Sequence, residues 1–140
     1  MAYQTHISRK SYFNCAHSYE VPGWTAEKNK EEFGKGFDNY GHGHNYTLEA
    51  HFKGPISEET GMIVNLRDVD IWLKAVLKTL DKKFLNKEVD YFKTKLPTTE
   101  NIAKYCFDHI LKKIDVDNVQ LVKVRVYEYE DLWAEYGDLY

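Results

Sequence analysis

Two histidines separated by one glycine give the strongest chemical signal in the sequence. His42 and His44 lie in the segment Gly-His-Gly-His-Asn-Tyr. Alternate side chains of an extended chain point to the same face, so these imidazoles would project side by side, about 6–7 Å apart along the backbone. His17 ends an earlier extended segment and would supply a third nitrogen if the two segments pair antiparallel. Three neutral histidines with one open position are typical of a catalytic zinc ion. The alternative is a group of surface histidines at a glycine turn.

A carboxylate on an apolar strand face is the second signal. Val122, Val124, Val126 and Glu128 alternate on one face of a predicted strand. An ionised side chain on such a face costs several kcal/mol unless it is paired or hydrogen-bonded. Glu128 is therefore a candidate acceptor for the N–H groups of a ligand. The alternative is that the strand ends at Tyr127 and that Glu128 is solvated.

Three shorter segments carry weaker signals. Thr98-Thr99-Glu100 precedes a predicted helix, and helix capping explains it, although a helix N-terminus also offers free N–H groups to a polar ligand. Asp81-Lys82 follows another predicted helix and is typical of a solvated C-terminal turn. Cys15 shares the face of His17, either as a buried apolar filler or as a nucleophile beside a metal.

Hydrophobic periodicity predicts the elements that must position these residues. Period-2 alternation indicates strands, and apolar stripes at helical spacing indicate helices, the first of them capped by Asn65. Residues 21–40 are polar and glycine-containing, which predicts a long functional loop. The grouped order of the elements favours an α+β fold with an antiparallel sheet. In chain order we expect strands at 5–17 and 44–53, a short extended stretch at 61–64, helices at 66–80 and 98–113, and strands at 119–130 and 133–136.

Length and charge limit the possible functions. The chain has 140 residues, with 19 basic and 22 acidic side chains and a net charge of −3. This length predicts one domain, residues 1–140, that buries about two thirds of its unfolded surface. The mixed charges predict no binding to nucleic acid or to an anionic membrane, and no apolar run is long enough for a membrane span. Two cysteines and the absence of an apolar signal region predict a cytoplasmic protein.

Taken together, the motifs resemble those of the 6-pyruvoyltetrahydropterin synthase family, which includes 6-carboxytetrahydropterin synthase of the queuosine pathway. The resemblance extends over about residues 5–130, with the motifs in the order that the family shows. Each motif alone is weak, and the set is specific. The set comprises Phe13–His17, Phe33–Lys35, Gly41–Tyr46, Gly61–Val64, Leu80–Asp81, Pro97–Asn101 and Glu128.

The resemblance implies a tunnelling fold, in which a four-stranded antiparallel sheet carries two helices on one face. It also implies that three subunits join their sheets into a barrel and that two trimers stack into a hexamer. The family's substrate is 7,8-dihydroneopterin triphosphate, from which triphosphate is eliminated. The implied site residues are the zinc ligands His17, His42 and His44, the pterin anchor Glu128, and the neighbouring Thr98, Thr99 and Glu100.

The sequence departs from the family at its usual proton-transfer residues. Gly36 stands where the animal-type enzymes carry a catalytic Cys, and Lys82 replaces the His that usually follows Asp81. Asp38 stands where the queuosine-type enzymes carry a Cys and where a third subgroup, which forms 6-hydroxymethyldihydropterin, carries Glu.

These observations predict a zinc-dependent pterin lyase with Asp38 as the base and Asp81 and Lys82 as a second proton-handling pair. One alternative is a catalytically impaired pterin-binding homologue that keeps the zinc site and the anchor. Another is a small structural protein with incidental histidines.

Overall fold

Four antiparallel strands form the sheet of the computed structural model, which describes residues 3–38 and 40–140. The strands are β1 (Thr5–His17), β2 (His42–Gly54), β3 (Gln120–Tyr129) and β4 (Leu132–Gly137). They lie in the order β1-β2-β3-β4, so each pairs with its neighbour in the sequence. The predicted α+β class with a four-stranded antiparallel sheet is confirmed.

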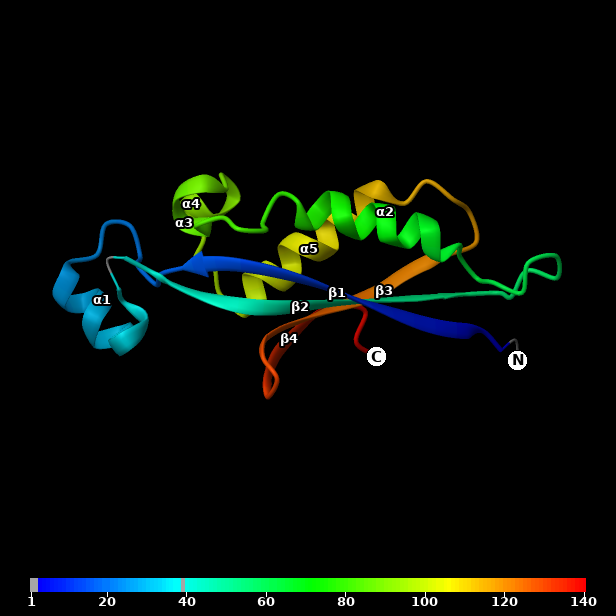
Figure 1. Cartoon of the computed structure of the whole chain (residues 1–140). Coiled ribbons are helices and arrows are strands. Elements are labelled where there is room, and N and C mark those ends of the chain that lie inside the picture. Colours follow the sequence, from blue (N-terminus) through cyan, green and yellow to red (C-terminus); the bar gives the residue numbers. More distant parts are fainter. Residues whose placement is uncertain (1–2, 39) are drawn as a thin grey trace.

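Two helices cover one face of this sheet (Figure 1). Helix α2 spans Leu66–Leu77 and helix α5 spans Thr99–Lys113. The short helices α3 (Leu85–Glu88) and α4 (Tyr91–Thr94) lie in the connection between them. Both long helices were predicted, because their apolar residues recur at helical spacing.

The N-termini of the two long helices are capped by side chains, as the sequence indicated. The Asn65 side chain accepts a hydrogen bond from the backbone N–H of Arg67, and the Thr98 hydroxyl accepts one from that of Asn101. Such caps satisfy N–H groups that have no partner inside the helix. The Thr98 cap matters for the site, because it fixes where α5 begins relative to the end of the sheet.

The core lies between the helices and the covered face of the sheet. Strand β2 contributes alternate residues to it, and α2 and α5 contribute their apolar stripes. Burial of these side chains removes apolar surface from water, which is the main force that holds the helices on the sheet. The least exposed members include Tyr46, Leu48, Ala50, Phe52, Val69, Leu73, Val76, Ile102, Cys106, Ile110, Val124 and Val126.

The opposite face of the sheet carries polar side chains. His51 and Glu49 of β2 form a hydrogen bond of 2.6 Å between Nε2 and Oε1, and Tyr127 of β3 donates to Glu49 Oε2 at 3.2 Å. Arg125 pairs with Glu135 across β3 and β4 at 3.0 Å. The sheet therefore buries one face against helices and presents a hydrogen-bonded polar face on the other side.

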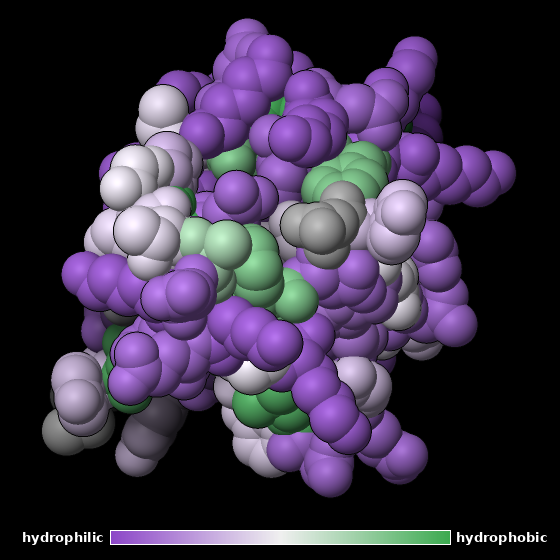
Figure 2. Space-filling view, turned by 90° about the vertical axis from the view of Figure 1, so that its left-hand side faces the viewer, coloured by the Kyte–Doolittle hydropathy of each residue, from purple (hydrophilic) through white to green (hydrophobic). Residues whose placement is uncertain are grey.

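The prediction of a loop at residues 21–40 is wrong over much of that range. Helix α1 (Ala26–Phe33) and a 3-10 turn (Gly34–Gly36) lie in it, and residue 39 of that range lies outside the described residues. Thr25 caps α1 by accepting from the Lys28 N–H. Only Asn29 of this helix is buried, so its sequence lacks the apolar stripe that identifies a packed helix. Figure 2 looks onto this end of the molecule, which is largely hydrophilic with separate hydrophobic groups.

Smaller differences concern the ends of other elements. Residues 61–64 form no strand, because Gly61 has a φ of +73° in a turn where the N–H of Ser57 donates to the Met62 carbonyl. Strand β2 begins at His42, two residues before the predicted start. Helix α2 ends at Leu77, three residues before the predicted end. In the part of the chain that the structure describes, no helix has both the length and the hydrophobicity needed to cross a bilayer.

Candidate metal centre

Strand pairing brings three histidines together at one end of the sheet. His17, the last residue of β1, lies directly opposite His42, the first residue of β2, and Cys15 lies opposite His44. The ring centroids of His17, His42 and His44 are 4.6 to 5.0 Å apart. His17 is fully buried, and His44 is 9% exposed. The antiparallel pairing expected from the sequence therefore places the three imidazoles side by side.

The nitrogens of this imidazole cluster are close enough to share one ion. One ligand nitrogen from each of the three rings lies within 4.8 Å of the others, and the Nε2 atoms of His17 and His42 are 3.1 Å apart. A tetrahedral ion with bonds of about 2.0–2.1 Å holds its ligand nitrogens about 3.3 Å apart. Among residues 3–38 and 40–140, no other group of three or more His, Cys, Asp or Glu side chains has such an arrangement.

The hydrogen bonds around the imidazole cluster leave ring nitrogens available for a metal. His17 Nδ1 donates to the carbonyl of Pro97 at 2.7 Å, which places the lone pair on Nε2. Histidines that bind metals usually donate their other ring N–H to such an acceptor. His44 Nε2 is buried and has no hydrogen-bond partner among the described residues. A buried polar atom without a partner is costly, and a cation shared with His17 would satisfy it. The donor set therefore fits a divalent transition metal.

Burial keeps two of these imidazoles neutral. It lowers the pKa of His17 and of His44 from the ordinary value of 6.5. The effect of burial on each pKa exceeds the opposing effects, which are the Pro97 hydrogen bond and the Glu128 charge for His17 and the Glu128 charge for His44. Only the neutral ring can donate a lone pair to a metal ion. His17 and His44 are therefore in the protonation state that metal binding requires at neutral pH.

Glu128 of β3 lies beside the imidazole cluster. Its side chain is 8% exposed, and its Oε1 atom is 3.6 Å from His17 Nε2 and 3.9 Å from His44 Nε2. The same oxygen accepts from the hydroxyls of Tyr46 at 3.4 Å and Tyr19 at 3.5 Å. Glu128 is therefore a buried acceptor on the helix-covered face, and the alternative of a solvated residue is wrong.

The segment before α5 also contacts the imidazole cluster. Pro97 holds the His17 ring, Thr98 caps the helix, and Thr99 is buried. Glu100 is exposed and lies close enough to Tyr19 for its charge to act on that phenol. The pKa of Tyr19 is raised, first by burial and further by nearby charges that include Glu100. The structure therefore brings Thr98, Thr99 and Glu100 to the end of the sheet that carries the imidazoles.

The three residues predicted to transfer protons have other contacts. Asp38 Oδ1 accepts from the backbone N–H of Tyr40 at 2.9 Å, in the turn that leads into β2. Asp81 Oδ1 accepts from the N–H of Asn14 at 2.8 Å, and the N–H of Lys82 donates to the Asn14 carbonyl. Asp81 and Lys82 thus lie along the outer edge of β1. In the described part of the chain, none of the three makes a hydrogen bond or ion pair with the imidazole cluster.

Cys15 fills the core rather than serving as a nucleophile. It is 1% exposed, and burial, followed by the charges of Asp81 and Glu128, raises the pKa of its thiol to about 12. A thiol with such a pKa is almost entirely protonated at neutral pH and is a poor nucleophile. The structure therefore favours the first of the two interpretations that the sequence left open.

Two residues beside the imidazole cluster were not identified from the sequence. Tyr19 and Tyr46 both reach Glu128 with their hydroxyls, and the Tyr46 hydroxyl is also 3.3 Å from His17 Nδ1. Tyr46 belongs to the His-Gly-His motif and alternates in phase with His44, which could have indicated its position. Tyr19 follows the end of β1, where the period of the strand no longer predicts a direction.

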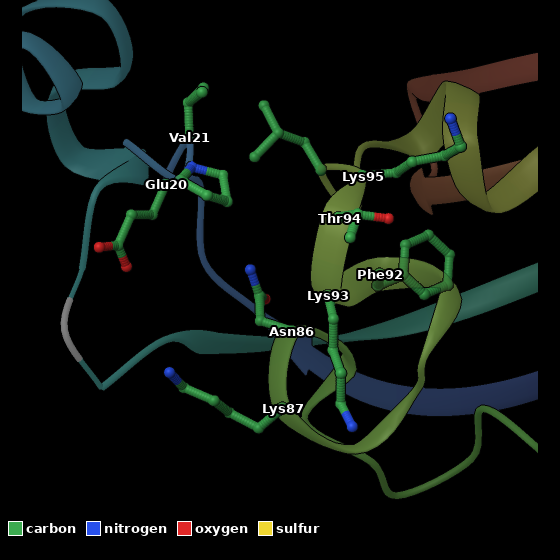
Figure 3. A pocket seen from close by; sticks show the side chains of 10 residues that line it. Glu20, Val21, Asn86, Lys87, Phe92, Lys93, Thr94 and Lys95 are labelled. Carbon is green, nitrogen blue, oxygen red and sulfur yellow. The ribbon is translucent and has the colours of Figure 1, made fainter. Parts of the chain in front are cut away.

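A neighbouring cavity has a volume of about 260 Å³, and Glu20, the residue after Tyr19, is part of its lining. The lining also includes three lysines from the α3 and α4 region, which are Lys87, Lys93 and Lys95. Figure 3 shows that the amino groups of Lys87, Lys93 and Lys95 point in different directions. Lys93 also pairs with Asp90 at 2.8 Å. The lysines of this cavity therefore do not converge on an anion.

A family model described as 6-pyruvoyl tetrahydropterin synthase matches residues 6–138. The Drosophila melanogaster protein named 6-pyruvoyl tetrahydrobiopterin synthase is 38% identical over 126 residues, which cover 87% of this chain and 73% of that one. The chain belongs to the 6-pyruvoyl tetrahydropterin synthase family. The solved structure of the Caenorhabditis elegans synthase superimposes with a TM-score of 0.90 at 30% identity, covering 96% of this chain and 95% of that one.

Another 6-pyruvoyl tetrahydropterin synthase relative carries a different name. A Pyrococcus furiosus protein named dihydroneopterin monophosphate aldolase is 29% identical over 129 residues, which cover 92% of this chain and 94% of that one. The relatives of this chain therefore carry names that refer to more than one reaction. The family assignment confirms the resemblance found in the sequence and identifies the chain as a member of a family of pterin lyases.

The metal-free protein is expected to lose stability as the pH falls below about 6.5. Burial lowers the pKa of His17, His44 and His51 in the folded state. The unfolded chain therefore binds these protons first, and each adds a slope of up to about 1.4 kcal/mol per pH unit against folding. Thermal unfolding between pH 7.5 and 5.5 measures the effect. His51→Gln should make the slope shallower, and a melting temperature that is constant over this range would contradict the prediction.

Proposed function

We propose that this protein is a zinc-dependent pterin lyase. Its substrate is 7,8-dihydroneopterin triphosphate or a related dihydropterin, on which it performs triphosphate elimination or side-chain cleavage. The observation that carries the proposal is the buried imidazole cluster beside Glu128 in a member of this family. The Pyrococcus furiosus relative named as an aldolase supports inclusion of side-chain cleavage.

In this proposal His17, His42 and His44 hold the zinc ion. Zinc supplies Lewis acidity to the hydroxyl groups of the substrate side chain. The chain itself supplies the orientation of the ligands, because Pro97 fixes the His17 ring through Nδ1. It also limits access of water, because His17 and His44 lie almost entirely within the protein.

Glu128 is proposed as the anchor of the pterin ring. Tyr19, Tyr46 and the neighbouring imidazoles all approach its Oε1 atom. Among the described residues none makes a hydrogen bond to Oε2, so this oxygen is available to ring N–H groups. A carboxylate can accept two such N–H groups with charge-assisted hydrogen bonds. Thr98, Thr99 and Glu100 are proposed to line the same end of the site.

Asp38 is proposed as the base, and Asp38→Asn is expected to lower turnover about 10²–10⁴-fold, the usual contribution of a general base. Asparagine keeps the acceptor for the Tyr40 N–H, which Asp38 Oδ1 receives at 2.9 Å, but it cannot take a proton. Zinc stoichiometry and pterin affinity should change little. The rate is measured with zinc-loaded protein, and affinity by calorimetry.

Asp38→Ala is the companion variant, because it also removes the turn acceptor. It should lower turnover as Asp38→Asn does, again with zinc and pterin affinity nearly intact. An Asp38→Asn protein that reacts at the wild-type rate would place the base elsewhere.

Assembly is proposed to complete the site. Asp81 and Lys82, the proposed second proton-handling pair, lie on the outer edge of β1 and, among the described residues, make no hydrogen bond or ion pair with the imidazole cluster of their own chain. Among the described residues, β4 and the part of β1 before Asn14 have no neighbouring strand on their outer side, which favours pairing with other copies. We propose a homotrimer whose sheets join into a barrel, or a hexamer of two trimers. Sedimentation as a monomer would contradict this proposal.

The location is proposed to be the cytoplasm. Cys15 and Cys106 are both free and buried, and unpaired thiols are typical of a reducing compartment.

A second candidate function is pterin binding without turnover. Gly36 carries no side chain, Asp38 is engaged in a turn, and Lys82 is exposed. These observations favour a homologue that keeps the imidazole cluster and Glu128 but has lost its proton-transfer groups.

One experiment separates the candidates. Zinc-loaded protein is incubated with 7,8-dihydroneopterin triphosphate, and the products are identified by mass spectrometry. Loss of triphosphate or loss of a two-carbon fragment supports a lyase and identifies its type. An unchanged substrate that nevertheless binds in calorimetry supports the binding protein. A protein that neither binds nor converts this pterin or its dephosphorylated form would refute both.

A further inference from the structure

Tyr19 lies where three parts of the site meet. Its ring is half-buried and packs at 4.9 Å, centroid to centroid, from His17 of the imidazole cluster. It also packs at 5.8 Å, centroid to centroid, from Phe33, the last residue of α1. Its backbone N–H donates to the carbonyl of Gly36 at 2.9 Å. Tyr19 therefore connects the α1 region, which lies beyond this end of the sheet (Figure 1), with the imidazole cluster.

The position of this ring depends on Gly36. A Cβ atom built on Gly36 would lie 2.6 Å from Cδ2 of Tyr19 and 3.5 Å from its Cγ. Carbon atoms that are not bonded prefer separations of about 3.5–4.0 Å, so any side chain at position 36 would displace the ring. The backbone of Gly36 does not require glycine for conformational reasons, because its φ is not in the left-handed region. Glycine at position 36 therefore leaves the space that the Tyr19 ring needs.

The hydroxyl of Tyr19 contributes to the orientation of the Glu128 carboxylate. It donates to Oε1 at 3.5 Å, the same oxygen that accepts from Tyr46. With both donors on Oε1, the carboxylate is held in one orientation, and Oε2 is left for a ligand. A buried carboxylate without such donors would have no defined orientation from hydrogen bonding.

We propose that Tyr19 is a positioning residue for the ligand-binding carboxylate of Glu128. The ring is set by contact with His17 and Phe33 in the space that Gly36 leaves, and its hydroxyl then holds Glu128 with Oε2 toward the ligand. This inference rests on the proposed function, because it takes the ligand of Glu128 to be a pterin.

Tyr19→Phe tests the inference, with Tyr12→Phe as the matched control. Phenylalanine keeps the ring and removes only the hydroxyl, whereas Tyr12 is 72% exposed on the helix-free face of the sheet. The dissociation constant of 7,8-dihydroneopterin is measured on zinc-loaded protein, together with zinc stoichiometry and melting temperature. We expect about a tenfold weaker affinity for Tyr19→Phe, the lower end for a hydrogen bond to a charged group, with zinc and melting temperature unchanged. Tyr12→Phe should match the wild type.

The outcomes distinguish this inference from the proposed function. If the wild type binds the pterin and Tyr19→Phe binds it within twofold, the positioning role is wrong and the proposed function stands. If affinity, zinc content and melting temperature all fall together, Tyr19 has a general structural role and the inference is again overturned. A wild type that does not bind the pterin overturns both.

Gly36→Ala provides a second test through the same contact. The added methyl group should move the Tyr19 ring and weaken pterin affinity by a similar factor. In the Tyr19→Phe background, Gly36→Ala should cause little further loss, because the hydrogen bond that it disturbs is already absent. If the double variant weakens pterin affinity by the product of the two single effects, the two changes act independently. That result would overturn the proposed connection between Gly36, Tyr19 and Glu128.

Discussion

Replacing His44 with alanine is expected to abolish stoichiometric zinc binding and to reduce turnover to background. His44 Nε2 is buried without a hydrogen-bond partner in the described part of the chain, and it lies in the imidazole cluster with His17 and His42. Loss of an outer-shell partner of a metal site already costs about 10–100-fold in affinity. Loss of one of three ligands should therefore cost at least about 100-fold. Elemental analysis and zinc titration measure the effect.

His6→Ala is the matched control for this prediction. His6 lies near the opposite end of β1, where its ring contacts His51 rather than the imidazole cluster. It should bind one equivalent of zinc as the wild type does. Circular dichroism of both proteins without metal establishes that they fold. A folded His44→Ala protein that still holds nearly one equivalent of zinc would show that the imidazole cluster is not the metal site.

Replacing Glu128 with glutamine is expected to weaken pterin binding about 100-fold or more while zinc binding is retained. Glutamine has nearly the same shape and can still accept from Tyr19 and Tyr46, which donate to Oε1 in the structure. It loses the negative charge, and hydrogen bonds to charged groups contribute about 1.5–3 kcal/mol each. Two ring N–H groups that lose a charged acceptor account for a change of this size.

The control for Glu128→Gln is Glu130→Gln, an exposed carboxylate two residues further along the chain. It should leave both pterin and zinc affinity at wild-type values. Calorimetric titration of zinc-loaded protein with 7,8-dihydroneopterin compares the three proteins. An unchanged dissociation constant for Glu128→Gln would mean that another group anchors the pterin.

The part of the site that strand geometry determines was predictable from the sequence. His42 and His44 are two residues apart in β2, and His17 ends the strand that pairs with it, so antiparallel register alone places the rings together. Glu128 was identified in the same way, because it continues the buried phase of Val124 and Val126. Period-2 alternation and strand pairing are local rules, and they carried this part of the prediction.

The part that depends on loops was not predictable in the same way. Helix α1 has one buried residue, Asn29, so no periodic pattern marked it. Tyr19 follows the end of β1, and its direction is set by packing against Phe33 and the space at Gly36. The sequence draws attention to Gly36 only because it lacks the side chain that the animal-type enzymes of the family carry there. The structure shows that the Tyr19 ring occupies the space next to this glycine.

Residues near the β1 edge show another limit. Asp81 was identified by its motif, but the sequence carried no information that its carboxylate binds the N–H of Asn14. Lys82 has a φ of 61°, in the left-handed region that side chains rarely adopt. Side-chain identity indicated the chemistry of these residues, whereas their positions depend on how the connection after α2 passes along the sheet edge.

The hydrogen bond from His17 to the Pro97 carbonyl has a consequence for how the protein responds to its metal. Pro97 immediately precedes the cap of α5, so the ligand ring and the first turn of that helix are held by one contact. Occupancy of the imidazoles and attachment of the helix are then linked equilibria, and each strengthens the other by the same free energy. Starving the protein of metal would loosen this end of α5, and any change that frays the start of the helix would in turn release the ion.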